Sequence, residues 1–319
     1  MRSLPVILDV DTGVDDALAL LFAVKHHAID VRAITCVAGN ASLAQVVDNT
    51  LRILDAADAP SIPVAAGAVR PLLATPRVAS HVHGQDGLGG LVLPTTNRVA
   101  EPVSAVELLR RTLMESDEPV TLVALAPQTN LALLLRTHPE VVDRIERIVF
   151  MGGSASVGNA TAVAEFNVWH DPEAAAIVLG SGIPTFMYGL DVFNQVTVDQ
   201  DRAAALASGP SGLGAVAGAL LSNRVALSED RSLVYTGLIG DAGAICALVD
   251  PDALRIERRP VRVELAGYGR GQTVVDRRRF SGEDAIHGGV GDWTAIDVAL
   301  DVDAPRYARL FLGTLGLAD

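Results

Sequence analysis

Four carboxylates stand within eight residues near the start of the chain, in the segment DVDTGVDD at residues 9–16. Asp9 and Asp11 come at the end of an apolar run that predicts a strand, whereas Asp15 and Asp16 open a predicted helix. A helix N-terminus favours one or two negative charges, but carboxylates this close raise one another's pKa unless a cation lies between them. Oxygen ligands of this kind are those that a hard divalent cation prefers. The cluster therefore predicts a metal or catalytic site rather than a simple helix cap.

The segments around this cluster alternate between short apolar runs and helical patterns. We expect strands at residues 5–10, 31–37, 120–124 and 145–151, and helices at residues 16–26, 43–56, 103–114 and 130–137. After Pro251 the pattern adds strands at residues 261–265, 273–276 and 295–300 and a helix at residues 304–314. Apolar strands that are each followed by a helix predict a parallel sheet covered on both faces. We therefore expect an α/β fold, a single domain over residues 1–319 with a mostly parallel, doubly wound sheet.

In such sheets ligands bind at the carboxyl ends of the strands. Residues 9–11, 39–40, 124–125 and 152–153 lie at the ends of predicted strands, so we expect them to converge on one active site. The segment 70–94 is rich in glycine, proline and histidine and predicts a long loop over that face.

The composition limits the partners and the compartment. The 319 residues include 25 Lys+Arg and 38 Asp+Glu, a formal net charge of −13, and only 4% are aromatic. A nucleic-acid binder needs a basic surface, so we expect neither nucleic acid nor a membrane as partner. No apolar stretch is long enough for a membrane span or a signal peptide. The two cysteines, Cys36 and Cys246, have no spacing typical of zinc sites or disulfides, and we expect a cytoplasmic protein.

Two enzyme families carry a carboxylate pair at a strand end. Residues 9–12 (DVDT) satisfy the DxDxT element of the magnesium-dependent, haloacid-dehalogenase-like phosphohydrolases, and residues 291–297 could pass for the late acidic motif of that family. The family usually has a distal lysine, however, and the single lysine of this chain, Lys25, lies too close to the first motif. The phosphohydrolase alternative also gives no role to Asp15 and Asp16.

The whole segment 9–16 instead resembles the DxDxxxDD fingerprint of the calcium-dependent nucleoside hydrolases. Further segments follow in the order of that family: VAGN at residues 37–40, HGQDGL at 83–88, LAPQTN at 125–130, and MGG, GN and AEFN between residues 151 and 167. The ordered set is more specific than any one motif. The resemblance implies hydrolysis of the N-glycosidic bond of a purine or pyrimidine ribonucleoside to ribose and free base. It also implies a homo-oligomer, because the family is usually dimeric or tetrameric.

The resemblance also implies roles for particular residues. It assigns Ca²⁺ to Asp11, Asp16, the backbone carbonyl of Leu125 and Asp241. Calcium takes six to eight oxygen ligands, which leaves positions for a water molecule and two ribose hydroxyls, and the ion lowers the pKa of that water. Asp11 is then the general base that deprotonates the water as it attacks the anomeric carbon with inversion.

The polar residues that the resemblance places around the substrate are Asp15, Asn40, His83, Asn159, Glu165 and Asn167. Asp15 matches a residue that contacts the ribose 2′-hydroxyl. Asn40 and Asn159 each follow a glycine, so turn chemistry is the other explanation for them. Glu165 and Asn167 would share one face on an extended backbone, and the alternative is an exposed polar pair. His83 could meet the nucleobase or serve only as a structural loop histidine.

This chain differs from the family it resembles at the residue before Asp241. Many members carry a histidine there, which can protonate the leaving base, and the purine-preferring branch carries a tryptophan, whereas this chain has Gly240. A different acid, a different substrate, or a riboside-binding member with weak activity all stay open. The base pocket should involve residues 224–237, whose polar candidates are Glu229, Asp230, Arg231 and Tyr235.

Overall fold

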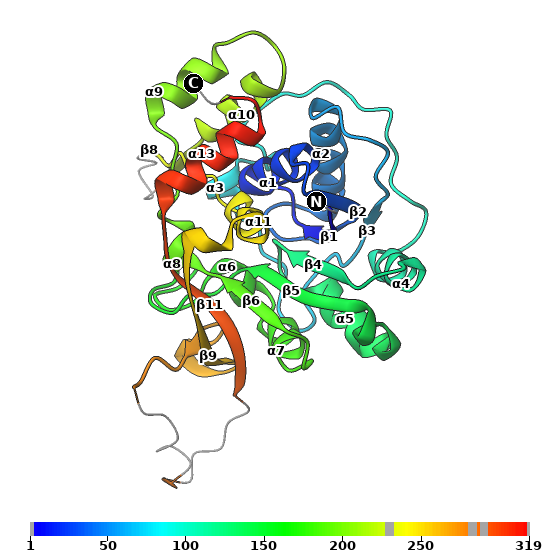
Figure 1. Ribbon diagram of the computed structural model, residues 1–319, viewed down its shortest axis with the longest axis vertical. Coiled ribbons are helices and arrows are strands. Elements are labelled where there is room, and N and C mark those ends of the chain that lie inside the picture. Colours follow the sequence, from blue (N-terminus) through cyan, green and yellow to red (C-terminus); the bar gives the residue numbers. More distant parts are fainter. Residues whose placement is uncertain (1–2, 227–232, 280–285, 288–292, 318–319) are drawn as a thin grey trace.

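A nine-stranded sheet forms the centre of the chain in this computed structural model, which describes residues 3–226, 233–279, 286–287 and 293–317 (Figure 1). Its strands, in sheet order, are β10 (Thr273–Val275), β9 (Leu254–Val263), β11 (Thr294–Val302), β6 (Thr185–Tyr188), β5 (Ile145–Met151), β4 (Val120–Ala124), β1 (Leu4–Val10), β2 (Ile29–Cys36) and β3 (Val64–Ala66). From β11 to β3 all neighbouring strands run parallel, whereas β9 pairs antiparallel with both β11 and β10. The expected mostly parallel α/β fold is confirmed.

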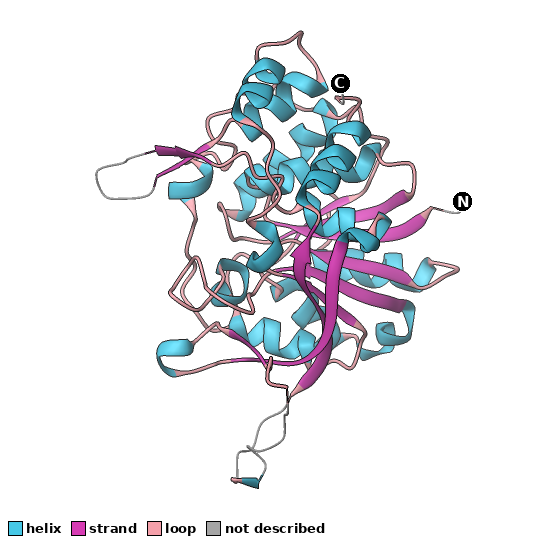
Figure 2. Cartoon of the chain, turned by 60° about the vertical axis from the view of Figure 1, so that its left-hand side comes forward, coloured by secondary structure: helices cyan, strands magenta, loops and turns pink. Residues whose placement is uncertain are grey.

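Helices cover both faces of this sheet (Figures 1 and 2). One face carries α1 (Val14–Lys25), α2 (Leu43–Ala56), α10 (Leu213–Leu221), α11 (Ala242–Val249) and α13 (Ala304–Thr314). The other carries α4 (Ala105–Glu115), α5 (Thr129–Thr137) and α7 (Pro172–Leu179). The shorter helices are α3 (Ser80–His83), α6 (Phe166–His170), α8 (Leu190–Phe193), α9 (Gln200–Ala207), η1 (Pro139–Arg144), η2 (Pro251–Ala253) and η3 (Gly267–Gly269), and β7 (Arg224–Ala226) pairs with β8 (Leu233–Tyr235). Among the described residues, no helix is long and apolar enough to cross a membrane.

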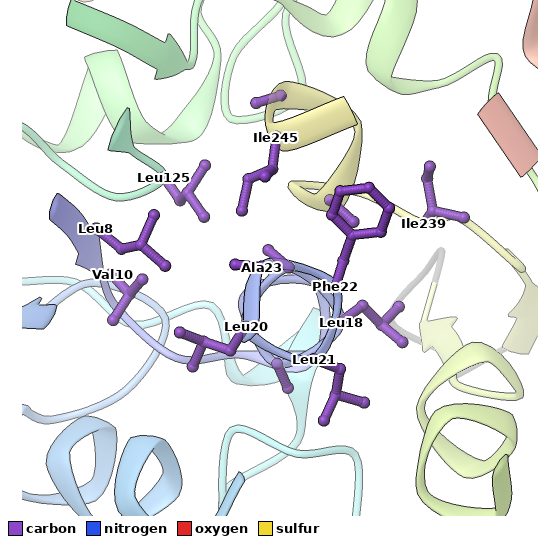
Figure 3. Packing of buried hydrophobic residues seen from close by; sticks show 14 of the residues in the cluster. Leu8, Val10, Leu18, Leu20, Leu21, Phe22, Ala23, Leu125, Ile239 and Ile245 are labelled. Atoms are coloured by element: carbon purple, nitrogen blue, oxygen red, sulfur yellow. The ribbon is translucent and has the colours of Figure 1, made fainter. Parts of the chain in front are cut away.

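Between Ala17 and Ala23, helix α1 is apolar and buried on all sides. Every residue from 17 to 23 has no exposed surface, and Figure 3 shows side chains from β1 and α11 packed around the helix. Phe22 also stacks on Phe311 of α13, with ring centroids 6.2 Å apart. Burial of each large apolar side chain contributes about 1.5–3 kcal/mol. This packing holds the first turn of α1, with its two carboxylates, at a fixed place on the sheet.

The sequence predicted most of these elements. The bounds of α2, β4, β5 and α13 are those expected, and the remaining predicted elements of residues 1–151 differ by one or two residues at their ends. The main difference is β9, a ten-residue strand that begins at Leu254 instead of Val261. Its antiparallel pairing with β11 explains the difference, because charged residues are tolerated on a strand near the sheet edge.

Candidate active site

Four acidic side chains meet at the carboxyl end of β1. Asp11 lies in the turn after β1, Asp15 and Asp16 lie in the first turn of α1, and Asp241 lies directly before α11. Carboxylate oxygens of Asp15, Asp16 and Asp241 lie within 4.8 Å of one another. Although Asp241 occupies the N-cap position of α11, its side chain accepts no capping hydrogen bond. Its carboxylate is therefore available to the cluster.

Asn40, at the end of the β2 segment, fixes two of these carboxylates. Its backbone N–H donates to Asp11 Oδ2 (2.7 Å), and its Nδ2 donates to Asp11 Oδ1 (3.1 Å) and to Asp16 Oδ2 (3.0 Å). A Cβ at Gly39 would lie 1.9 Å from Asp11 Oδ2, so only glycine allows this approach. Asp16 also accepts hydrogen bonds from the backbone N–H groups of Gly13 (2.9 Å) and Asp11 (3.2 Å). The predicted convergence of the strand ends is confirmed here.

Burial raises the pKa of Asp11, Asp16 and Asp241. The pKa of Asp11 lies well above its usual value because the group is buried and because Asp16 is close. Burial and the charge of Asp15 raise the pKa of Asp16 to about 7. Burial, with Asp15 next in importance, also raises the pKa of Asp241 well above its usual value. Among the described residues no lysine or arginine forms an ion pair with these carboxylates, so this part of the chain offers no cation to balance their charge.

Asp9 supports this site from outside the cluster. Its Oδ1 accepts hydrogen bonds from Thr35 Oγ1 (2.5 Å) and from Asn130 Nδ2 (2.8 Å). Asn130 Nδ2 also donates to the backbone carbonyl of Cys36 (3.0 Å). Asp9 therefore ties the end of β1 to β2 and to α5, which agrees with a supporting role rather than metal ligation.

A cavity of about 360 Å³ opens over the acidic cluster. The residues proposed from the sequence that line it are Asp15, Asn40, His83, Leu125, Asn159, Glu165, Asn167 and Asp241. Asp11 and Asp16 are fully buried and adjoin this lining through Asn40. The residues to which the resemblance assigns calcium, catalysis or substrate binding are thus brought together.

Glu165 and Asn167 connect the ends of β4 and β5, but not on an extended backbone as expected. Glu165 is the N-cap of α6 and accepts hydrogen bonds from the backbone N–H groups of Asn167 (2.8 Å) and Gly153 (2.9 Å). Asn167, within the helix, donates from Nδ2 to the carbonyls of Leu125 (2.9 Å) and Met151 (3.1 Å). Both side chains are buried, so the exposed-pair alternative is wrong. Burial raises the pKa of Glu165 to about 7.

His83 and Asn159 contribute from the segments that cover the cavity. His83 Nδ1 accepts the backbone N–H of Val14 (3.1 Å) and lies 3.7 Å from Asp15 Oδ1. Burial lowers the pKa of His83, so the neutral ring carries its proton on Nε2. Asn159 is exposed, and its Oδ1 accepts the N–H of Phe166 (2.9 Å), a loop contact of the kind that turn chemistry predicts.

The sequence model of the inosine-uridine preferring nucleoside hydrolases matches residues 6–309. The chain belongs to this family. The pyrimidine-specific ribonucleoside hydrolase RihA of Escherichia coli O1:K1 / APEC is 42% identical over 285 residues, which cover 88% of this chain and 91% of that protein. A plant nucleoside hydrolase, PpNRh1, has a TM-score of 0.86 at 30% identity and covers 97% of this chain and 98% of its own. The purine-preferring ribonucleoside hydrolase from Gardnerella vaginalis has a TM-score of 0.85 at 30% identity, with 98% of each chain covered.

A nucleoside hydrolase is a hydrolase of the N-glycosidic bond of ribonucleosides. This assignment excludes the dehalogenase-type phosphohydrolase, the alternative that the DVDT segment at residues 9–12 also allowed. It also accounts for Asp15 and Asp16, which that alternative left without a role.

Gly240 distinguishes this nucleoside hydrolase from the members of the family that have histidine or tryptophan before the aspartate corresponding to Asp241. Its φ is +58°, a conformation that favours glycine. A Cβ at this position would lie 2.3 Å from the Cβ of Asp15. No side chain fits there unless Asp15 moves, so this position supplies no acid for the leaving base.

Several residues of the cavity were missed by the motifs. They include the exposed Arg77 and His81, the half-buried Phe166 and Trp169, and the buried Phe193. Arg77 and His81 do lie in the long loop predicted over this face, but no residue spacing identified them. Tyr235, in contrast, donates its hydroxyl to the carbonyl of Val198 (2.6 Å) and does not line the cavity. Glu229, Asp230 and Arg231, like Asp292 of the rejected late motif, lie outside the described residues.

Proposed function

We propose that this chain hydrolyses pyrimidine ribonucleosides to ribose and the free base, with calcium held in the acidic cluster. The observation that carries the proposal is the cavity over this cluster, whose lining combines the polar side chains of Asn40, Glu165 and Asn167 with aromatic rings such as those of Phe166 and Trp169. A ribose with its hydroxyls suits the polar part, and a flat base suits the apolar part.

The donor set fits calcium. Asp11, Asp16, the Leu125 carbonyl and Asp241 would hold the ion, and all of them supply oxygen, which calcium prefers over the nitrogen and sulfur ligands of zinc. A carboxylate oxygen of Asp15 lies within 4.8 Å of carboxylate oxygens of Asp16 and Asp241. When bound, the ion would lower the pKa of a water molecule and hold ribose hydroxyls in place.

Asp11 is the proposed general base. The two hydrogen bonds from Asn40 fix its carboxylate, and a carboxylate held in this way can accept a proton from a water molecule bound beside it. It removes a proton from the attacking water as the water oxygen bonds to the anomeric carbon. The attack comes from the face opposite the base and gives inversion, as in inverting glycosidases.

The remaining polar residues hold the sugar and meet the base. We assign Asp15, Asn40, Asn159, Glu165 and Asn167 to the ribose hydroxyls, because amides and carboxylates can bind several hydroxyls at once. Nε2–H of His83 is assigned to the nucleobase, since Nδ1 is occupied by the N–H of Val14. The chain is also proposed to act in the cytoplasm as a homo-oligomer, with its two cysteines free and buried.

The proposed base preference is tested with uridine, cytidine and inosine under one set of conditions. The higher identity to a protein described as pyrimidine-specific, 42% against 30% for one described as purine-preferring, supports pyrimidines. We expect kcat/KM for uridine or cytidine to exceed that for inosine by at least about tenfold, a difference of roughly 1.4 kcal/mol in transition-state binding. Equal or faster hydrolysis of inosine would overturn the preference, while leaving ribonucleoside hydrolysis in place.

A further inference from the structure

The two parts of the cavity differ in charge. The inner, more buried part presents the carboxyl groups of Asp15, Glu165 and Asp241, whereas the outer, more exposed part presents the half-buried rings of Phe166 and Trp169. A single guanidinium, that of Arg77, lines the outer part within the described chain. A ribose bound over the acidic cluster leaves the outer part of the cavity, which Arg77 lines, for the base.

Arg77, an exposed residue, stacks on an aromatic ring and is not paired with an acid in the described chain. Its Cζ lies 3.9 Å from the centroid of the Trp169 ring, and it forms no ion pair with any residue in the described ranges. Trp169 is itself fixed, because the chain at Gly271 packs so closely that a Cβ there would lie 2.6 Å from the Cα of Trp169. The segment that precedes Arg77 is attached to α7 through the N–H of Leu72, which donates to Asp171 Oδ2 (2.9 Å). A guanidinium stacked on a ring keeps its N–H groups free at its edge.

The departing base carries a negative charge that a positioned cation such as Arg77 can stabilise. When the C1′–N bond breaks, its electron pair stays on the base, and a pyrimidine spreads that negative charge onto its carbonyl oxygens. The backbone at Gly240 leaves no room for a side chain that could neutralise the charge. A positioned cation lowers the barrier by stabilising charge that develops in the transition state.

We propose that Arg77, held over Trp169, is the residue that stabilises the departing base by donating hydrogen bonds to its carbonyl oxygens. The inference rests on the proposed function. In the step it assists, water gives its hydroxyl to C1′ and a proton to Asp11, while the C1′–N electron pair leaves with the base. The base anion then takes a proton from solvent, and Asp11 returns its proton to solvent, so that one water is consumed for each ribose and base released.

The test compares two ribosides whose leaving groups differ in their stability as anions. Uridine releases a poor leaving group, whereas p-nitrophenyl β-D-ribofuranoside releases p-nitrophenolate, a stable anion that departs unaided. With Ca²⁺ present, we expect Arg77→Met to lower kcat for uridine by about 10²-fold, the effect of losing one preorganised donor. The same variant should leave kcat for the nitrophenyl riboside within about twofold of the wild-type value.

Two further variants make the result specific. Arg77→Lys keeps the positive charge but loses the planar fork, so it should recover part of the uridine rate. Arg70→Met removes an exposed arginine of the same loop that does not line the cavity, and it should change neither rate. Equal losses on both substrates, or no loss on uridine, would overturn the role of Arg77. Failure of the wild-type chain to cleave even the nitrophenyl riboside would instead overturn the proposed function, and the inference with it.

Discussion

Asp11→Asn should lower kcat for ribose release by about 10³- to 10⁴-fold while KM changes little. The asparagine oxygen can still accept the N–H of Asn40, which Asp11 Oδ2 accepts at 2.7 Å, although the hydrogen bond from Asn40 Nδ2 to Asp11 Oδ1 is lost. The backbone contact that positions residue 11, and with it the cavity, should therefore be kept. The amide cannot take the proton of the attacking water. Steady-state kinetics with uridine, together with riboside binding measured by calorimetry, separate the loss of chemistry from a loss of binding.

Asp58→Asn is a matched control for this variant. Asp58 has a φ of +45° in the turn after α2, a conformation that asparagine adopts readily. The same chemical change at this remote position should leave kcat unaltered. If Asp11→Asn kept the wild-type rate, Asp11 would not be the general base.

Removal of calcium should make the stability of the chain depend strongly on pH. Burial raises the pKa of Asp16 from 3.8 to about 7 and that of Glu165 from 4.5 to about 7. Between about pH 4 and pH 7 the folded, calcium-free chain therefore binds more protons than the unfolded chain, and its free energy of unfolding falls as the pH rises. One carboxyl shifted by three units corresponds to about 4 kcal/mol. Calcium binds the ionised carboxylates, so it should offset this loss.

Thermal unfolding at about pH 5 and about pH 8, in EDTA and in Ca²⁺, measures this linkage. We expect Tm in EDTA to fall by about 5–10 °C between the two pH values, and the fall in Ca²⁺ to be much smaller. Asp16→Asn removes one of the titrating groups and one proposed ligand, so it should reduce both the pH dependence in EDTA and the gain from Ca²⁺. Parallel pH dependences with and without Ca²⁺ would contradict a cation site in the acidic cluster.

The sequence predicts the position of the acidic residues near β1 well, because they stand at the ends of predicted strands. Apolar runs that end at Asp11 and before Asn40 put both residues at one edge of a parallel sheet, and the two side chains are hydrogen-bonded there. Asp241 is far away in sequence, and only the family resemblance connected it with Asp16. The geometry that brings it there is the packing of α1 against α11 (Figure 3).

The outer part of the cavity could not be predicted in the same way. Arg77 lies in a loop without periodic pattern, and its contact with Trp169 depends on how that loop folds back over α6. Similarly, the spacing of Glu165 and Asn167 suits one face of a strand, whereas the capping hydrogen bonds of Glu165 begin a helix instead. Gly240 could be recognised as a departure from the family, but its close approach to Asp15 is visible only in three dimensions.

The central claim is that this chain cleaves the N-glycosidic bond of a ribonucleoside at the acidic cluster with calcium. The most direct measurement is the release of ribose and base from uridine by the purified wild-type chain, in Ca²⁺ and after dialysis against EDTA. The account predicts ribose and uracil in equal amounts with Ca²⁺, almost none in EDTA, and recovery when Ca²⁺ is added back. An unchanged rate in EDTA, or no ribose from any ribonucleoside in Ca²⁺, would contradict it.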